Sequence, residues 1–299
     1  MAAVLSRRER MASELRDRHL LFTGLRSVLS SYFATQRLTA SFEPIHLPRD
    51  AHVRRQTLLR VSQRKIRDAR LVLLARCRHV DLSQPHSSNE WFEGDNGELC
   101  LQQFDVTPLR CPCSIRQVYE AIGFCAQNVE ILVSERIGDL TLREDDDTDE
   151  SSGGGVRVSQ RRILSNTGFG ITIDANVALF RQHIAKGVCE ELLDEHALLT
   201  TQSIETDALY PYVPNERVRH DMDSAVLVQQ IPSPHNDHDF VTTIVRMSTI
   251  KRHPSGSVTM NVDNTRTTTR LLAMQWGDLL LQAVCERVEH DVATQAKAI

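Results

Sequence analysis

Apolar residues recur at helical spacing in two blocks near the start of the chain. The first block predicts a helix from about residue 5 to 33. Pro44 and Pro48 then interrupt helical geometry, because neither can donate a backbone hydrogen bond. A second helix is predicted from about Asp50, a suitable N-cap, to about Val80. Its apolar stripe is Leu59, Ser62, Ile66, Ala69, Leu73 and Val80.

Beyond residue 98 the hydrophobic period becomes typical of strands. Residues 98–106 predict a strand, and Ser114 can cap a helix that runs to about Cys125. The segments that follow are rich in Val, Ile and Thr, which favours strands. These predicted strands are residues 129–142, 156–164, 169–180, 188–204, 218–231 and 240–251, although 188–196 fits a helix equally well.

The chain closes with a long amphipathic helix, predicted for residues 267–296. Its apolar face includes Trp276, Leu279 and Leu280, while Asp278 points away from that face. The order of elements is strand, helix, several consecutive strands and a long helix. This order predicts an α+β fold, in which helix covers one side of an antiparallel sheet.

The charge of the chain changes sign near residues 80–90. Residues 1–80 hold 17 Lys and Arg against 6 Asp and Glu, whereas the remainder holds 18 against 33. We therefore predict a basic helical segment at 1–82 and a larger domain at 90–299. The sequence SQPHSSNE at residues 83–90 predicts a linker between them.

The sequence lacks the motifs of several kinds of catalytic and metal-binding site. The sequence has no G-x-S-x-G elbow, H-E-x-x-H pair, Walker loop or Rossmann glycine motif. We therefore predict that the protein is not an enzyme. The acidic run at 144–155 lacks the Gly and Glu that a calcium loop needs, so it predicts a mobile, solvated loop. Cys111 and Cys113 form a single C-x-C, whereas structural zinc sites use two close ligand pairs. We therefore predict no metal site and no cofactor.

Composition indicates a cytoplasmic or nuclear protein. The longest apolar run, residues 71–75, is far shorter than the ~20 residues of a membrane helix. The N-terminus carries three arginines without an apolar stretch, so no secretory signal is expected. Seven scattered cysteines, an odd number, predict reduced thiols.

Three stretches of the larger part carry a family resemblance. They are residues 101–108 (LQQFDVTP), 134–147 (SERIGDLTLREDDD) and 210–221 (YPYVPNERVRHD). Through these three stretches, the part of the chain from roughly residue 90 to 299 resembles the oomycete mating-specific, START-like family. The resemblance implies a START-like helix-grip domain, in which a curved antiparallel sheet surrounds a long C-terminal helix above a cavity. Members often carry a basic-zipper-like segment first, but here no Leu heptad is sustained.

The first functional hypothesis is non-catalytic binding of an apolar, lipid or sterol-like ligand in that cavity, with a regulatory or scaffolding role. The alternative for each apolar residue is plain core packing. Arg217 and Arg219 share a face and suit an anionic headgroup, or else they pair with surface carboxylates. The predicted ligand-binding residues are Phe169, Ile171, Ile173, Arg217, Arg219, Trp276, Leu279 and Leu280.

The second hypothesis is a regulatory protein that binds nucleic acid through the basic helix at 50–80. Its phosphate-binding candidates are Arg54, Arg55, Arg60, Arg64, Lys65 and Arg67. However, the helix also has an apolar stripe, which needs an apolar partner that a phosphate backbone cannot offer. We therefore favour docking of this helix on the acidic domain, or self-association, over nucleic-acid contact.

Overall fold

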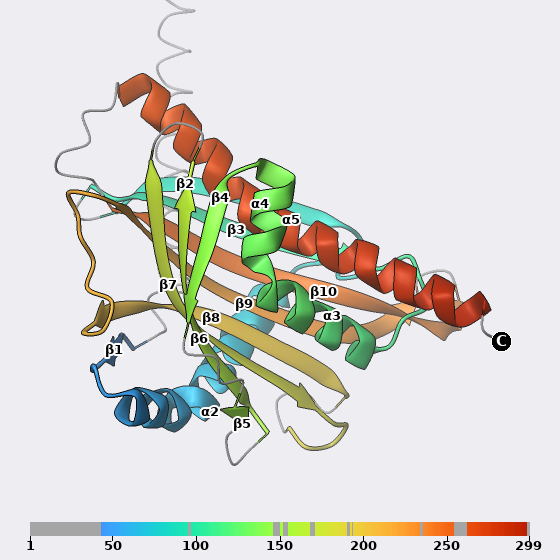
Figure 1. The fold of residues 1–299 in the computed structure, drawn as a ribbon. Helices are drawn as coiled ribbons and strands as arrows, with labels where there is room; N and C mark the ends of the chain where they lie inside the picture. Colours follow the sequence, from blue (N-terminus) through green and yellow to red (C-terminus); the bar gives the residue numbers. More distant parts are fainter. Residues whose placement is uncertain are drawn as a thin grey trace, which may run out of the picture.

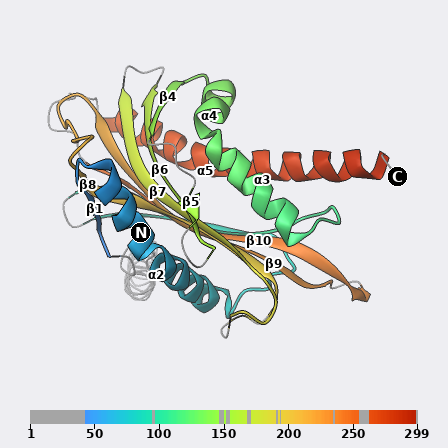
Figure 2. The same cartoon turned by 60° about the horizontal axis from the view of Figure 1, so that its bottom comes forward.

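One large sheet, mostly antiparallel, dominates the molecule and carries helices on both faces (Figures 1 and 2). The predicted first helix, at about residues 5–33, lies outside the described part of the chain. The computed structural model describes residues 43–94, 97–145, 150–151, 155–167, 171–189, 192, 194–233, 236–253 and 262–297.

The main strands follow the order β2-β3-β10-β9-β8-β7-β6-β4 across the sheet. Strand β10 pairs antiparallel with both β9 and β3, which brings together segments far apart in the sequence. Short strands β1 and β5 add to β8 and β6. The strands are β1 (Ile45–Leu47), β2 (His86–Glu93), β3 (Leu99–Pro108), β4 (Leu140–Asp145), β5 (Glu150–Ser151), β6 (Arg157–Asn166), β7 (Thr172–Ile184), β8 (His196–Asp207), β9 (Val218–Ser233) and β10 (Asn236–Arg252).

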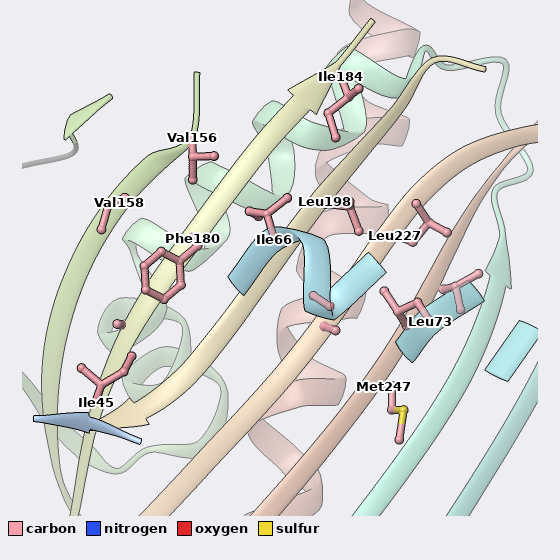
Figure 3. Close-up of a cluster of buried hydrophobic side chains, with 14 of the residues drawn as sticks. Ile45, Ile66, Leu73, Val156, Val158, Phe180, Ile184, Leu198, Leu227 and Met247 are labelled. Carbon is pink, nitrogen blue, oxygen red and sulfur yellow. The ribbon is translucent and has the colours of Figure 1, made fainter. Parts of the chain in front are cut away.

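Helix α2 (Ala51–Cys77) covers one face of the sheet. It begins as predicted, with Asp50 accepting a hydrogen bond from the backbone N–H of Val53. Ile66 and Leu73 of α2 pack against Phe180, Met247 and neighbouring strand residues (Figure 3). The apolar stripe of the basic helix thus finds its partner within the same chain.

Two details of the N-terminal prediction change in the structure. Leu58, rather than Leu59, is the fully buried leucine at the start of the α2 stripe. Strand β1 and helix α2 also share one hydrophobic core with the sheet. The division of the chain at 82–90 into two domains stays a prediction.

Helices α3 (Ile115–Gln127), α4 (Val129–Ile137) and α5 (Val262–Lys297) cover the opposite face of the sheet. Ser114 caps α3 as predicted, in a reciprocal capping box with Gln117. The antiparallel sheet and the long C-terminal helix are therefore confirmed. None of the described helices combines the length and apolar character that a membrane span requires.

Two segments differ from the sequence prediction. Residues 129–142, predicted as a strand, begin with α4, because Val129 and Val133 lie one turn apart on a buried face and Gly138 ends the helix in the left-handed region. Residues 86–90, predicted as linker, belong to β2, which pairs with β3 despite its polar sequence. An edge strand tolerates polar side chains because much of it faces solvent.

Candidate ligand-binding cavity

A cavity of about 170 Å³ lies between the sheet and α5, with α3 and α4 at its side. Val177 and Leu179 of β7 contribute to its floor, because alternate residues of a strand point to the same face. Leu280 and Val284, one helical turn apart, line it from α5. Its position matches the cavity that the sequence resemblance implies.

The volume of the cavity limits what it can hold. Typical pockets for drug-sized ligands measure roughly 300–1,000 Å³. An engineered apolar cavity of roughly 150 Å³ admits benzene. The cavity of about 170 Å³ therefore suits one ring or the end of an acyl chain. A whole sterol is too large for this volume.

Arg246 introduces a buried charge into this apolar setting. It lies mid-way along β10, is 7% exposed and lines the cavity. Its Nε and Nη2 donate to Asp105 Oδ2 at 2.9 and 2.6 Å, and Nη2 also donates to Asp278 Oδ1 of α5 at 2.6 Å. The remaining nitrogen, Nη1, is buried and has no hydrogen-bond partner among the residues that the structure describes.

The close approach of α5 to Arg246 depends on a glycine. A Cβ atom added at Gly277 would lie 2.7 Å from Arg246 Nη1, so only glycine leaves room for the guanidinium in its present position. Asp105 is held from its other side, where Oδ1 accepts a hydrogen bond of 2.7 Å from Ser87 Oγ. The sheet and α5 thus meet in a charged bridge at one side of the cavity.

Trp276 of α5 is, after Arg246, a second residue of the cavity wall with a polar N–H group. It is 4% exposed and packs against Val133, Ile163 and their neighbours, as the sequence predicts for a buried helix face. Within the described part of the chain, its indole Nε1 has no acceptor. The His220 ring lies 6.4 Å away between centroids, and burial lowers the pKa of His220 to about 4, which keeps that ring neutral near pH 7.

Asp223 of β9 also lines the cavity. The direct pairing of β8 with β9 ends at Thr201 and Ser224, and Asp223 Oδ1 accepts a hydrogen bond of 2.8 Å from the Ser203 backbone N–H just beyond that point. Loss of hydration raises the pKa of the Asp223 carboxyl to about 7. This carboxyl therefore changes charge near neutral pH.

The structure brings only part of the predicted ligand-binding set to the cavity. Trp276 and Leu280 line it. Ile173 is buried, and Ile171 and Leu279 are partly buried, but none of these three belongs to the cavity wall. Phe169 lies outside the described residues.

Arg217 and Arg219 lie elsewhere. Arg219 lines a separate, polar pocket of about 330 Å³, where its Nε donates to Asp221 at 2.7 Å and its Nη atoms donate to backbone carbonyls of β8. Arg217 Nη1 lies 3.5 Å from Asp174 Oδ2. Both arginines thus pair with carboxylates, and neither belongs to the wall of the apolar cavity.

The predicted phosphate-binding set is also divided. Arg54 is buried and donates to Asp207 at 2.5 and 2.9 Å. Lys65 is buried, donates to the Glu43 carbonyl at 2.5 Å, and has its pKa lowered by burial to about 8. These two are therefore unavailable to phosphates. The four members that remain exposed are Arg55, Arg60, Arg64 and Arg67.

Sequence analysis missed Arg246 and Asp223, which line the cavity, and Asp105, which pairs with Arg246. The signal available was a charged residue inside the Val- and Thr-rich strand FVTTIVRMSTI. A charge in such a strand indicates a buried ion pair or a functional group. Its partner Asp105 lies 141 residues earlier, so local patterns could not identify it.

No family model matches the sequence, and no curated protein does. Among solved structures, the fold is similar to the crystal structure of human STARD10, with a TM-score of 0.38 and 11% sequence identity. The alignment covers 79% of this chain and 84% of that chain. With values this low, function is inferred from this chain's own residues.

Proposed function

We propose that this protein is a non-catalytic, START-like helix-grip module that binds an apolar ligand under α5 and serves a regulatory or scaffolding role in the cytoplasm or nucleus. The observation that carries the proposal is the cavity between the sheet and α5, whose wall is mostly aliphatic. From the three stretches of sequence resemblance, we also propose that the chain is a member of the oomycete mating-specific, START-like family.

The polar atoms of the wall add a requirement on the ligand. Arg246 Nη1 and Trp276 Nε1 are donors for which the described residues supply no acceptor, and both residues line the cavity. A buried donor left unpaired costs roughly 1–3 kcal/mol. A ligand oxygen that accepts from either nitrogen recovers part of that free energy. The ligand therefore joins a ring-sized apolar part to a hydrogen-bond acceptor such as a carboxylate.

Two probes separate the apolar and polar parts of this proposal. Benzene tests the apolar space, and benzoate tests the same space with an added carboxylate. We expect saturable shifts of the Val177, Leu199 and Leu280 methyl NMR signals with both probes. Arg246→Lys, which retains a charge beside Asp105, should weaken benzoate more than benzene, because it removes the guanidinium fork.

A filled cavity provides the decisive control. Val226→Phe adds volume to the cavity wall, whereas Val72→Phe adds the same volume to a half-buried site on α2, across the sheet. Only Val226→Phe should abolish the benzene shifts. Equal losses in both variants, or the absence of saturable shifts in the native protein, would contradict the proposal.

A further inference from the structure

The solvent-facing side of α2 forms a straight ridge of arginines and exposed apolar side chains. Val53 and Leu71 are 45% and 47% exposed and lie 18 residues apart. Since about 3.6 residues make one turn, the two side chains point in the same direction, five turns apart. The other members of the ridge are Arg60, Arg64, Arg67 and Arg78, each within about 40° of the same line.

The arginines of this ridge are accessible. All four are exposed, and in the described part of the chain neither Arg60 nor Arg78 has an ion-pair partner. Arg64 pairs with the exposed Glu43, and Arg67 Nε lies 3.9 Å from Asp68. Exposed pairs of this kind contribute little to stability and exchange readily for other anions.

The opposite side of α2 is already occupied. Leu58, Ile66 and Leu73 are buried in the core against the sheet. The helix is therefore a fixed rod, about 40 Å long for its 27 residues, rather than a segment that must fold on contact. A partner would therefore contact a preformed line of positive charge that includes two exposed apolar side chains, Val53 and Leu71.

We propose that this ridge docks on an anionic lipid bilayer. The guanidinium groups complement phosphate and carboxylate headgroups, and arginine stems can lie along the interface while their charges stay in water. Val53 and Leu71 enter the boundary between headgroups and acyl chains, an environment that a nucleic-acid backbone does not provide. This surface lies across the sheet from the cavity, so the inference stands independently of the proposed ligand.

Vesicle sedimentation with the full-length protein tests the inference. The protein should bind vesicles of phosphatidylcholine and phosphatidylserine at low salt, and should bind pure phosphatidylcholine vesicles weakly. The double variant Arg60→Gln/Arg67→Gln should reduce binding to the anionic vesicles roughly 30-fold. Leu71→Ser should also weaken this binding, by a smaller factor. Circular dichroism confirms that the variants, all at exposed positions, remain folded.

The matched control removes the same charge elsewhere. Arg110 and Arg116 are exposed near the start of α3, on the other side of the sheet. Arg110→Gln/Arg116→Gln should leave vesicle binding within about twofold of the native protein, because their charges lie away from the docked face. Equal losses in both double variants would overturn the proposal, as would binding that does not depend on phosphatidylserine. Preference for duplex DNA at matched salt, unaffected by Leu71→Ser, would replace the bilayer with nucleic acid.

Discussion

The same strands of the sheet support a filled core on one face and a cavity on the other. On the α2 face, Phe180 and Leu73 are wholly buried among aliphatic neighbours. On the α5 face, Leu179 of the same strand, β7, lines the cavity. The sheet backbone is shared, so the difference arises from the side chains and the covering helices. A face covered by interdigitating apolar residues provides stability, whereas a face that keeps polar groups inside leaves space for a ligand.

Polar residues explain where the packing on the α5 face is interrupted. Gln103, Arg246 and Ser248 lie side by side on β3 and β10 and line the cavity. Their hydrogen-bond geometry fixes their positions, so they cannot shift to fill the volume as aliphatic side chains would. On the α2 face two buried charges of the helix pair outside the apolar cluster: Arg54 bridges to Asp207, and Lys65 donates to the Glu43 carbonyl.

Trp276→Ala should produce the largest loss of stability. Deleting a buried aromatic side chain usually costs about 3–5 kcal/mol, because apolar contacts are lost and a void remains. Trp276 is 4% exposed and packs between α4 and the sheet. Urea denaturation monitored by circular dichroism measures the change. A loss below about 1 kcal/mol would mean that the cavity face does not depend on this contact.

Removing the charge of Arg54 tests the buried ion pair that joins the first turn of α2 to Asp207. Arg54→Met leaves the buried Asp207 carboxylate without its cation, and breaking a buried pair in this way usually costs about 3–5 kcal/mol. The double variant Arg54→Met/Asp207→Leu should recover part of the loss, because neither charge is then left unpaired. A double variant less stable than Arg54→Met would show that the pair is not the cause.

Leu73→Ala and Leu71→Ala compare a buried and an exposed position of the same helix. Leu73 is fully buried on the sheet, whereas Leu71 is 47% exposed two residues earlier. The buried substitution should cost about 2–5 kcal/mol. Leu71→Ala should remain within about 0.5 kcal/mol of the native protein. Similar effects at the two positions would contradict the observed packing of α2.

Local patterns in the sequence were sufficient for elements whose signals are local. The N-cap at Asp50, the capping box at Ser114 and the burial of Trp276 are all observed. Segment 129–137 was assigned to the wrong class because its β-branched residues mask a spacing of four between Val129 and Val133.

The candidate site was harder to predict than the fold. Pairing of β10 with β3 places Arg246 opposite Asp105, and a single sequence gives no information about that register. Arg219 is predicted at the ligand because it precedes a strand and shares a face with Arg217. Its position depends on β9 pairing with β7 beside it, which again is a long-range contact. Long-range pairing thus decides which polar residues share a cavity.

The effect expected at Asp223 depends on pH. Its pKa is raised to about 7 in the folded protein, whereas an unfolded Asp titrates near ~3.9. Between these values the folded state holds a proton that the unfolded state has released, so this group contributes less stability as pH rises from about 4 through 7. Asp223→Asn removes that dependence, while its amide oxygen can still accept from the Ser203 N–H.

The variant should therefore match the native protein near pH 4 and become more stable relative to it up to about pH 8. A difference of ~1 kcal/mol corresponds to roughly 2–4 °C in Tm for a domain of this size. Calorimetry across that pH range measures this difference in Tm, and Asp291→Asn, at a partly exposed position of α5, is the matched control. Parallel Tm curves for Asp223→Asn and the native protein would show that the carboxyl does not titrate in this window. In that case the Asp223 carboxyl would keep a single protonation state throughout the range.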